Sequence, residues 1–363
     1  MRIVLPAGDF SQSKNLEELA VELKRRGHAV ESFLAFGKKE LLGNPERASE
    51  EASQADLVVV GICDNNLVDL AVCKAAIESG GRVKLGLLST GYASHRHEAF
   101  VETRAHADLV ILSEQGACEE TQRLFPKAKV VVTGDPIWDQ HVFDLQPQEE
   151  VAKLLEIEAG ECVILAPLVR DTVRDFLLAK DLAEAALLLK RKDGVRPRVI
   201  FGLHPGDKPE GKEKMRRLAS SLSECIEVPI KVTDRNADGT TDIVPVKTTD
   251  IVPVCNIVVT SISSVDTAAA MWEKPSIAYL HWDADEHLRK LFGDAPWQPT
   301  DVDMVSSGLR KASAYDLYAQ IKILLTPEGY AFQKQRQEHC YPRPTEKGAI
   351  IRTMADEVEK LFR

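Results

Sequence analysis

Residues Asn256 to Leu280 read NIVVTSISSVDTAAAMWEKPSIAYL and contain two short apolar runs on either side of a helical segment. The runs, Asn256–Thr260 and Ser276–Leu280, have the composition of strands that are buried on both faces of a parallel sheet. Pro275 separates the helical segment from the second run. The stretch therefore predicts a β-α-β unit whose two strands belong to one sheet.

Three serines, Ser261, Ser263 and Ser264, follow the first of these strands at the point where the predicted helix begins. Hydroxyls, backbone N–H groups and the positive end of a helix dipole would converge there, and such a position suits a phosphate group. Ser263 with Asp266 three residues later also fits an N-cap with a short capping box, which needs no ligand. A phosphate site and a helix cap both stay open as interpretations.

The chain has 363 residues, which favours two domains of ordinary size over a single core. Apolar residues make up 44% and charged residues 28%, so a disordered chain is excluded. No apolar run reaches the ~18 residues that a transmembrane helix needs. The N-terminal residues MRIVLPAGDF lack the pattern of a signal peptide, so we expect a cytoplasmic protein, with peripheral attachment to a membrane left open.

Cysteine content and net charge limit the partners that we expect. The seven cysteines include no Cys-x-x-Cys pair and lie mostly in apolar segments, which indicates neither disulfides nor structural zinc. We expect no metal site and no cofactor. The net charge of −10 disfavours a nucleic-acid partner, but it leaves open a local basic site for a small phosphorylated ligand.

Short apolar runs alternate with helical patterns along the chain, which is typical of a doubly wound α/β protein. The first six strand candidates are Arg2–Pro6, Ala29–Ala35, Asp56–Gly61, Val83–Ser89, Asp108–Ser113 and Lys129–Thr133. Five more follow a proline-containing break: Cys162–Ala166, Arg198–Leu203, Ile226–Val232, Asn256–Thr260 and Ser276–Leu280. We predict two Rossmann-like domains facing across a cleft, residues 1–148 and 149–344, with a C-terminal helix (345–363) packed on the first.

One heptapeptide, TTDIVPV, occurs at 240–246 and again at 248–254. Two copies are too few for a solenoid, so a local duplication is the simpler interpretation. Pro245 and Pro253 argue against a continuous helix through this region.

In doubly wound sheets, ligands bind beyond the carboxyl ends of the strands. The loop after the first strand offers Gly8, Asp9, Ser11 and Ser13, where Gly8 would let backbone approach an acceptor. It contains one glycine and no G-x-G-x-x-G, so a dinucleotide site is poorly supported. A later loop carries His95 and His97. We consider His95, His97 and Asp9 as candidate catalytic bases, with plain surface histidines as the alternative.

In the second domain, Arg170 follows one strand and His204 follows the next. Arg170 would bind a diphosphate through its planar fork, or would form a surface ion pair. If these strands neighbour the one that precedes the serine cluster, the residues converge on one crevice. The convergence favours an anion site formed by Arg170, His204, Ser261, Ser263, Ser264 and Asp266.

These motifs resemble those of glycosyltransferases of the GT-B architecture and their relatives, over nearly the whole chain. The resemblance to several such families is carried by VVTGDPIWD (Val131–Asp139), A-P-x-x-R ending at Arg170, L-H-P (203–205), S-S-V (263–265) and Lys274-Pro275. Similar segments occur in polyol-phosphate transferases, in lipid A disaccharide synthase and in non-hydrolysing UDP-N-acetylglucosamine 2-epimerases. The resemblance implies a nucleotide-activated donor held mainly by the second domain.

The chain departs from these families at two places. Five positions after Ser263, where the families usually carry an acidic residue toward the ribose, the chain has Ala268. Asp266 is about 200° away around a helix, so it cannot take over that contact directly. In the first domain, a Ser-Thr-Gly-Tyr segment (89–92) stands near the place of the H-G-T or H-V-E-A-G-like motifs.

We therefore expect a glycosyltransferase that moves a sugar from a nucleotide-diphosphate sugar to an unidentified acceptor, as in cell-envelope polysaccharide or glycolipid synthesis. A lipid-linked acceptor is left open. The alternatives are a 2-epimerase of UDP-N-acetylglucosamine, a polyol-phosphate transferase, and a degenerate, non-catalytic member. Ala268 favours the degenerate member, whereas Arg170 and His204 oppose it.

Overall fold

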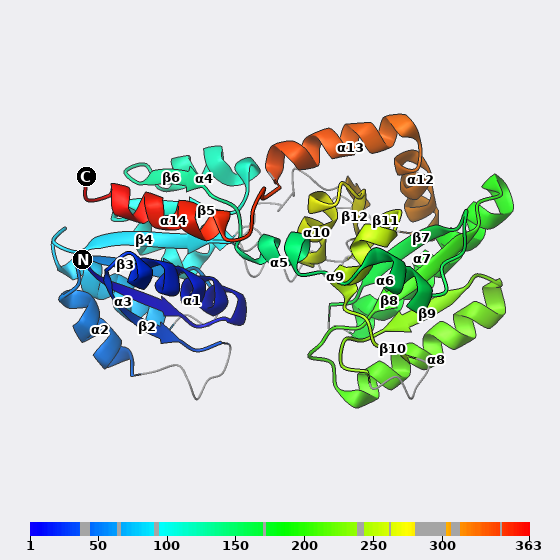
Figure 1. Ribbon diagram of the computed structural model, residues 1–363, viewed down its shortest axis with the longest axis horizontal. Coiled ribbons are helices and arrows are strands. Elements are labelled where there is room, and N and C mark those ends of the chain that lie inside the picture. Colours follow the sequence, from blue (N-terminus) through cyan, green and yellow to red (C-terminus); the bar gives the residue numbers. More distant parts are fainter. Residues whose placement is uncertain are drawn as a thin grey trace. The chain divides into compact units, whose positions relative to one another are not determined.

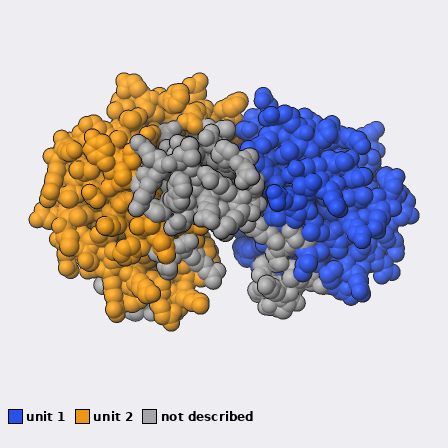
Figure 2. Space-filling view, turned by 180° about the vertical axis from the view of Figure 1, so that it is seen from behind, with its two compact units in different colours: residues 1–139, 289–299, 344–363 blue, residues 140–288, 300–343 orange. Residues whose placement is uncertain are grey.

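The computed structural model describes residues 1–36, 44–63, 67–90, 94–169, 172–237, 243–260, 263–279, 303–305, 313–341 and 343–363. The chain divides into two compact units (Figure 2). The first contains Met1–Asp139 and Pro344–Arg363, and the second contains the described residues from Gln140 to Arg343. The chain first leaves unit 1 within helix α5 (Ile137–Phe143), earlier than the predicted boundary after residue 148.

The first unit is built on a six-stranded sheet in which every neighbouring pair is parallel. Its strands are β1 (Arg2–Ala7), β2 (Ala29–Leu34), β3 (Leu57–Gly61), β4 (Lys84–Ser89), β5 (Leu109–Leu112) and β6 (Lys129–Val132), in the order β2-β1-β3-β4-β5-β6. Its helices are α1 (Phe10–Arg25), α2 (Pro45–Ser53), α3 (Leu67–Glu78), α4 (Cys118–Leu124) and α14 (Ala349–Lys360), with 3-10 helices η2 (Ser94–Arg96), η3 (Glu98–Ala105) and η4 (Gln115–Ala117).

Helices cover both faces of this sheet, so the strands are apolar throughout. Val4, Val58 and Val60 point toward a cluster that includes residues of α2 and α3. The alternate residues Ile3 and Leu57 are also fully buried. Helix α14 packs against α1 (Figure 1), and Arg26 Nη2, at the end of α1, donates to the Arg352 carbonyl at 3.1 Å.

The second unit is built on a seven-stranded sheet, again parallel at every described pairing. Its strands are β7 (Cys162–Pro167), β8 (Pro197–Gly202), β9 (Ile230–Thr233), β10 (Ile243–Val244), β11 (Ile257–Thr260), β12 (Ser276–Tyr279) and β13 (Asp303–Val305), in the order β10-β9-β8-β7-β11-β12-β13. Its helices are α6 (Gln148–Leu154), α7 (Thr172–Asp193), α8 (Pro209–Ile226), α9 (Thr248–Ile251), α10 (Val265–Met271), α12 (Ala314–Leu324) and α13 (Pro327–Cys340), with the 3-10 helix η5 (Val252–Val254).

The β-α-β unit predicted from residues 256–280 is present as β11, α10 and β12. Alternate residues of β11 face opposite layers of the unit. Ile257 and Val259 join a core cluster with α7, α8 and α12, whereas Val258 joins a second cluster with α6, α9 and α10. Burial on both faces explains the continuous apolar run that the sequence shows.

Some element boundaries differ from the predicted ones. Helix α8 continues to Ile226, so the strand predicted from that residue begins only at Ile230. Ile226 packs against the α7 and α8 core, which explains why an apolar residue there extends the helix. The short strands β10 and β13 were not predicted. No helix among the described residues is long and apolar enough to span a membrane.

A buried ion pair links the amino ends of β7 and β8 in the second sheet. Arg198 on β8 donates from Nε and Nη2 to the two carboxylate oxygens of Glu161, at 2.6 and 3.1 Å. Both side chains are nearly buried, with exposed fractions of 7% and 5%. An exposed pair nearby, Arg196 with Glu158 at 2.6 Å, offers a matched comparison on the same two strand starts.

Removal of one partner of the buried pair should destabilise the protein strongly. We expect Glu161→Gln to cost about 3–5 kcal/mol of unfolding free energy, because it leaves the Arg198 charge buried and unpaired. Glu158→Gln should cost at most about 1 kcal/mol, since water screens the exposed pair. Denaturant unfolding of both variants measures the difference. Equal costs would contradict the assignment of Arg198–Glu161 as a structural pair.

Candidate functional site

The candidate site in the second unit lies where the direction of strand addition reverses. From β7 the sheet continues through β8, β9 and β10 on one side, and β11, β12 and β13 lie on the other. Strands β7 and β11 are direct parallel neighbours, with Ile164 opposite Ile257 and Leu165 opposite Val258. Their carboxyl ends therefore lie together at a topological switch point, where ligands of doubly wound sheets bind.

The serine cluster follows β11 at this switch point. Ser264 occupies the N-cap position of α10, and Val265 N–H donates to Ser263 Oγ at 3.3 Å. Ser264 is exposed and Ser263 is half-buried, whereas Ser261 lies outside the described residues. Ser263 Oγ therefore accepts one backbone N–H at the start of the helix, but the N-cap residue is Ser264 rather than the predicted Ser263, and the Ser264 side chain makes no cap hydrogen bond.

Two residues of α10 point away from solvent. The Asp266 side chain is only 3% exposed in the first turn of the helix. Ala268 is 1% exposed and packs in the core cluster that contains Val258 and Val265. A carboxylate at position 268 would be desolvated in this packing, so the alanine suits the core. Ribose contacts, if a nucleotide binds, have to come from other residues.

His204 lies two residues beyond the end of β8, next to β7 in the sheet. Its ring nitrogen Nδ1 accepts a hydrogen bond from Gly206 N–H at 3.0 Å. In a neutral imidazole the proton is then on Nε2, which makes Nε2 the donor that a phosphate oxygen needs. Pro167 is opposite Gly202 in the β7–β8 register, so His204 belongs to the same edge as the switch point.

The loop after β7 is fixed by a buried carboxylate. Val169 N–H donates to Asp175 Oδ1 at 3.0 Å, and Asp175 is 3% exposed in the first part of α7. The next residue, Arg170, lies outside the described residues. The structure thus places the neighbour of Arg170 at the switch point, while the predicted diphosphate contact of Arg170 stays a prediction.

The first unit has its own switch point, between β1 and β3. Gly8 N–H donates to Asp69 Oδ2 at 3.3 Å, and the Cys63 thiol donates to the same oxygen at 2.9 Å. Asp69 is fully buried in the first turn of α3. Burial raises the pKa of Asp69 to about 7, although the hydrogen bonds from Cys63 and Gly8 oppose the rise. The chain's own carboxyl group therefore occupies the Gly8 amide that we expected to face an acceptor.

The other residues of the predicted acceptor loop have different surroundings. Ser13 is fully buried, where its hydroxyl donates to the Ala7 carbonyl and accepts from Phe36 N–H, both at 3.0 Å. Ser11 is exposed on α1, and Asp9 is half-buried at the N-cap position of that helix. Ser13 thus ties the loop to β2, whereas Ser11 and Asp9 remain within reach of a ligand.

The two candidate histidines of the first unit have local partners. His95 is 5% exposed and lies 3.2 Å from Glu120 Oε2 through Nε2. Burial lowers the pKa of His95, although the Glu120 carboxylate opposes that shift. His97 Nδ1 accepts from Ala99 N–H at 3.2 Å and caps η3, with its ring edge-on to Phe100. His97 is half-buried, so it is the more accessible of the two.

A polar cluster at the same edge of the first sheet was not predicted. Asn15 Nδ2 donates to Thr90 Oγ1 at 3.1 Å, and Thr90 Oγ1 donates to Gln12 Oε1 at 3.2 Å. Asp135, after β6, lies beside Asn15 and Thr90 and accepts from Ile137 N–H at 3.0 Å, and burial raises its pKa to about 6. Gln12 and Asn15 lie three residues apart on α1, but the sequence does not show that Thr90 and Asp135 lie beside them.

No group of three or more His, Cys, Asp or Glu side chains suited to a metal ion occurs among the described residues. The sequence does contain two Asp-x-Asp pairs, Asp283 with Asp285 and Asp301 with Asp303, of the oxygen-donor kind that divalent cations prefer. Of these four residues, only Asp303 lies within the described residues. The expectation of metal-independent chemistry therefore stays a prediction.

Comparison with solved structures decides the fold. No known protein-family profile matches the chain, and no curated protein matches it in sequence. The S. aureus MnaA–UDP complex is similar with a TM-score of 0.59 and 14% identity, over 99% of this chain and 96% of that one. The chain has the GT-B fold.

Two further structures show how widely the likeness extends. UDP-GlcNAc 2-epimerase from Neisseria meningitidis, bound to UDP-GlcNAc, has a TM-score of 0.57 and 13% identity, over 99% of this chain and 100% of that one. A UGT transferase from Siraitia grosvenorii in complex with UDP has a TM-score of 0.58 and 11% identity, over 99% of each chain. At these identities the likeness establishes the GT-B fold and leaves the activity to be argued from the residues.

The raised pKa of Asp69 predicts how stability changes with pH. The folded protein holds the carboxyl proton more tightly than the unfolded chain, whose Asp pKa is about 4, so stability falls as pH rises from about 4 to about 7. Asp69→Asn keeps an acceptor for Gly8 N–H but cannot ionise. We therefore expect the Tm of the variant, relative to the wild type, to rise between about pH 4 and about pH 7. A constant difference in Tm would contradict the assignment.

Proposed function

We propose that the protein is a glycosyltransferase that binds a nucleotide-diphosphate sugar at the carboxyl edge of the second sheet. The observation that carries the proposal is the convergence of three loops at one switch point. Val169 follows β7, His204 follows β8 and Ser264 follows β11, and these strands are neighbours. The GT-B fold is shared with proteins whose structures contain UDP or UDP-GlcNAc, and this supports the choice of ligand.

In this proposal, neutral and cationic hydrogen-bond donors together bind the diphosphate of the sugar nucleotide. His204 donates from Nε2, and the hydroxyls of Ser263 and Ser264 donate from the start of α10. Arg170 and Ser261 contribute from the positions that the sequence gives them. Asp266 acts as a positioning residue inside the first turn of α10, since its side chain is buried. The residues that contact the diphosphate stabilise the charge that develops on it as it leaves, and this is their catalytic role.

The acceptor hydroxyl needs a base, and we propose Asp9 for that role. Asp9 is half-buried at the N-cap position of α1, next to the switch point of the first sheet. His97 is the second candidate because it is partly accessible. His95 is proposed to orient the loop through Glu120, since burial disfavours its charged form.

A second candidate function is 2-epimerisation of UDP-N-acetylglucosamine, which the fold shared with the Neisseria epimerase favours. The two functions differ in what they require. An epimerase converts UDP-GlcNAc in the absence of any acceptor, whereas a transferase releases UDP only when an acceptor is present. Incubation of the protein with UDP-GlcNAc alone, followed by NMR of the sugar ring, separates them.

The donor site predicts a specific effect of His204→Ala. We expect the variant to lose roughly 10- to 150-fold in affinity for the best donor, because a hydrogen bond to a charged phosphate contributes about 1.5–3 kcal/mol. The measurement is isothermal titration, after a thermal-shift panel of UDP-, GDP-, CDP- and dTDP-sugars has selected the donor. His106→Ala changes an exposed histidine of the first unit and should bind that donor like the wild type.

Wild-type affinity in His204→Ala would contradict the proposed site. The same titration tests Arg170, for which the lysine variant should bind better than the alanine variant, because lysine keeps the charge but not the planar fork.

We also expect turnover to be independent of divalent metal. The described residues contain no metal-binding cluster, and the proposed charge stabilisation comes from His204, the serines and Arg170. Activity in EDTA should equal activity in Mg²⁺ or Mn²⁺. A loss in EDTA that either cation restores would contradict this mechanism and would direct attention to Asp283 and Asp285.

A further inference from the structure

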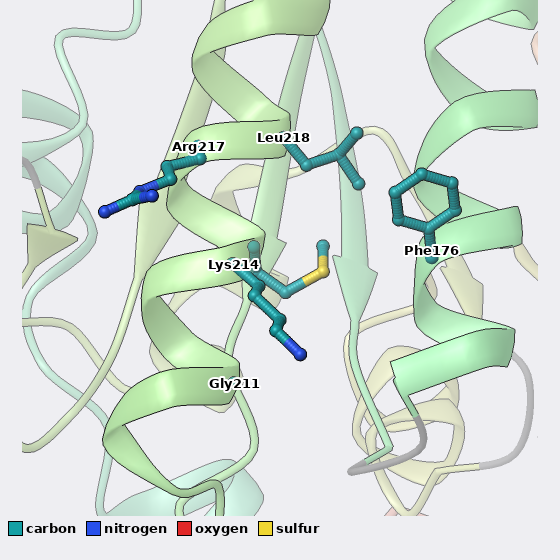
Figure 3. Close-up of a pocket in the computed structure, with 6 residues that line it drawn as sticks. Phe176, Gly211, Lys214, Arg217 and Leu218 are labelled. Carbon is teal, nitrogen blue, oxygen red and sulfur yellow. The ribbon is translucent and has the colours of Figure 1, made fainter.

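A groove lies on the surface of the second unit between helices α7 and α8. Its volume is about 360 Å³, and it is lined by Phe176, Gly211, Lys214, Met215, Arg217 and Leu218. Figure 3 shows Phe176 on α7 facing Leu218 on α8 across the groove, while Arg217 points away from Phe176. The volume lies within the range of pockets that hold small molecules, about 300–1,000 Å³.

The groove exposes apolar surface that the core does not use. Phe176 is 49% exposed, and Val173, three residues earlier on α7, is 58% exposed. Met215 and Leu218 form the opposite wall, and both lie on the face of α8 that meets the core. An exposed aromatic ring against an apolar wall is suited to a hydrocarbon chain.

The charges beside the groove are basic, although the chain as a whole is acidic. Residues 207–217 contain five basic and three acidic side chains, in a protein with a net charge of −10. Lys212 is paired with Asp234, and Arg216 and Arg217 share Glu213. Lys214 lines the groove and is exposed, and it has no ion-pair partner among the described residues. An anionic head group complements this lysine.

The groove also has a defined direction. Phe176 and Gly211 belong to the beginnings of α7 and α8, which follow β7 and β8. The end of the groove at Phe176 and Gly211 is therefore the end nearer the carboxyl edge of the sheet, where the loop that contains His204 follows β8. An occupant whose chain lies between the helices would hold its polar end near that edge.

We propose that this groove is a binding site for a single-chain amphiphile with a phosphate head group, such as an acyl or prenyl phosphate. The hydrocarbon chain packs between Phe176 and Leu218, and Lys214 binds the phosphate. The site is separate from the donor-binding residues and does not depend on the proposed function.

The test uses dodecyl phosphate below its micelle concentration, titrated calorimetrically into the full chain. Dodecyl maltoside has the same chain with a neutral head, and inorganic phosphate has the head without the chain. We expect 1:1 binding of dodecyl phosphate, several-fold weaker binding of the maltoside and no binding of phosphate. Equal affinity for the two amphiphiles would overturn the role of Lys214, and binding only to vesicles of anionic lipid would indicate a membrane surface instead.

Matched variants locate the site. Phe176→Ser should weaken dodecyl phosphate binding about tenfold or more, because the half-exposed ring would lose its apolar contact with the hydrocarbon chain. Lys214→Gln should weaken it about threefold, as expected for an exposed charge. Phe332→Ser on α13 and Lys74→Gln on α3 change exposed side chains elsewhere, at 62% and 77% exposure, and should bind like the wild type.

Unchanged binding in Phe176→Ser, or equal losses in Phe332→Ser, would overturn the proposal. Since Phe176 is half-exposed, its replacement leaves the core intact, and a circular-dichroism melt verifies this. A titration of the same variants with UDP-sugars separates the two sites: loss of amphiphile binding with intact donor binding is the expected result, and absence of donor binding in every protein would bear on the proposed function alone.

Discussion

The parallel pairing of β11 with β7 is the constraint on which the second unit depends. It brings Val258 beside Leu165, two residues far apart in the sequence. Strands β8, β9 and β10 lie on one side of this pair, and β12 and β13 lie on the other. Because β11 is buried on both faces, its loss would remove apolar contacts from both core clusters at once. The same pairing sets the end of β11, and therefore Ser264, beside the loop after β7. Core packing and the candidate donor site thus have one origin.

The first unit has a different strand order, β2-β1-β3-β4-β5-β6, and its switch point lies between β1 and β3. There the Gly8 amide and the Cys63 thiol are both bonded to buried Asp69. The sequence predicted a ligand-facing Gly8 because a glycine follows a strand, which is a local signal. Asp69 is 61 residues away, so only the fold reveals the contact. Residues next to strand ends, such as His204 and Ser264, were predictable because their position needs only the strand. Asn15 and Thr90 were not, since their contact spans 75 residues.

The secondary structure shows the same contrast between features set by local sequence and features set by distant contacts. Strands such as β3, β7 and β11 were predictable because burial on two faces leaves a continuous apolar run, whereas the short strands β10 and β13 were not. The repeated heptapeptide shows the limit of such reasoning. Its residues Ile243–Val244 form β10 beside β9, whereas the identical Ile251-Val252 belongs to α9 and η5 and is fully buried. Identical local sequence adopts two structures here, so tertiary packing decides between them. No single-sequence pattern contains that information.

Hydrogen–deuterium exchange of the full chain, with and without a saturating nucleotide-diphosphate sugar, tests the central claim directly, since bound ligand slows local opening of the backbone that it contacts. The account predicts slower exchange in peptides that cover Val169, His204 and Ser264, which come from three separate parts of the sequence. Peptides of α13 should exchange as before. Protection confined to the first unit, around Gly8 and His97, would contradict a donor site at the switch point of the second sheet.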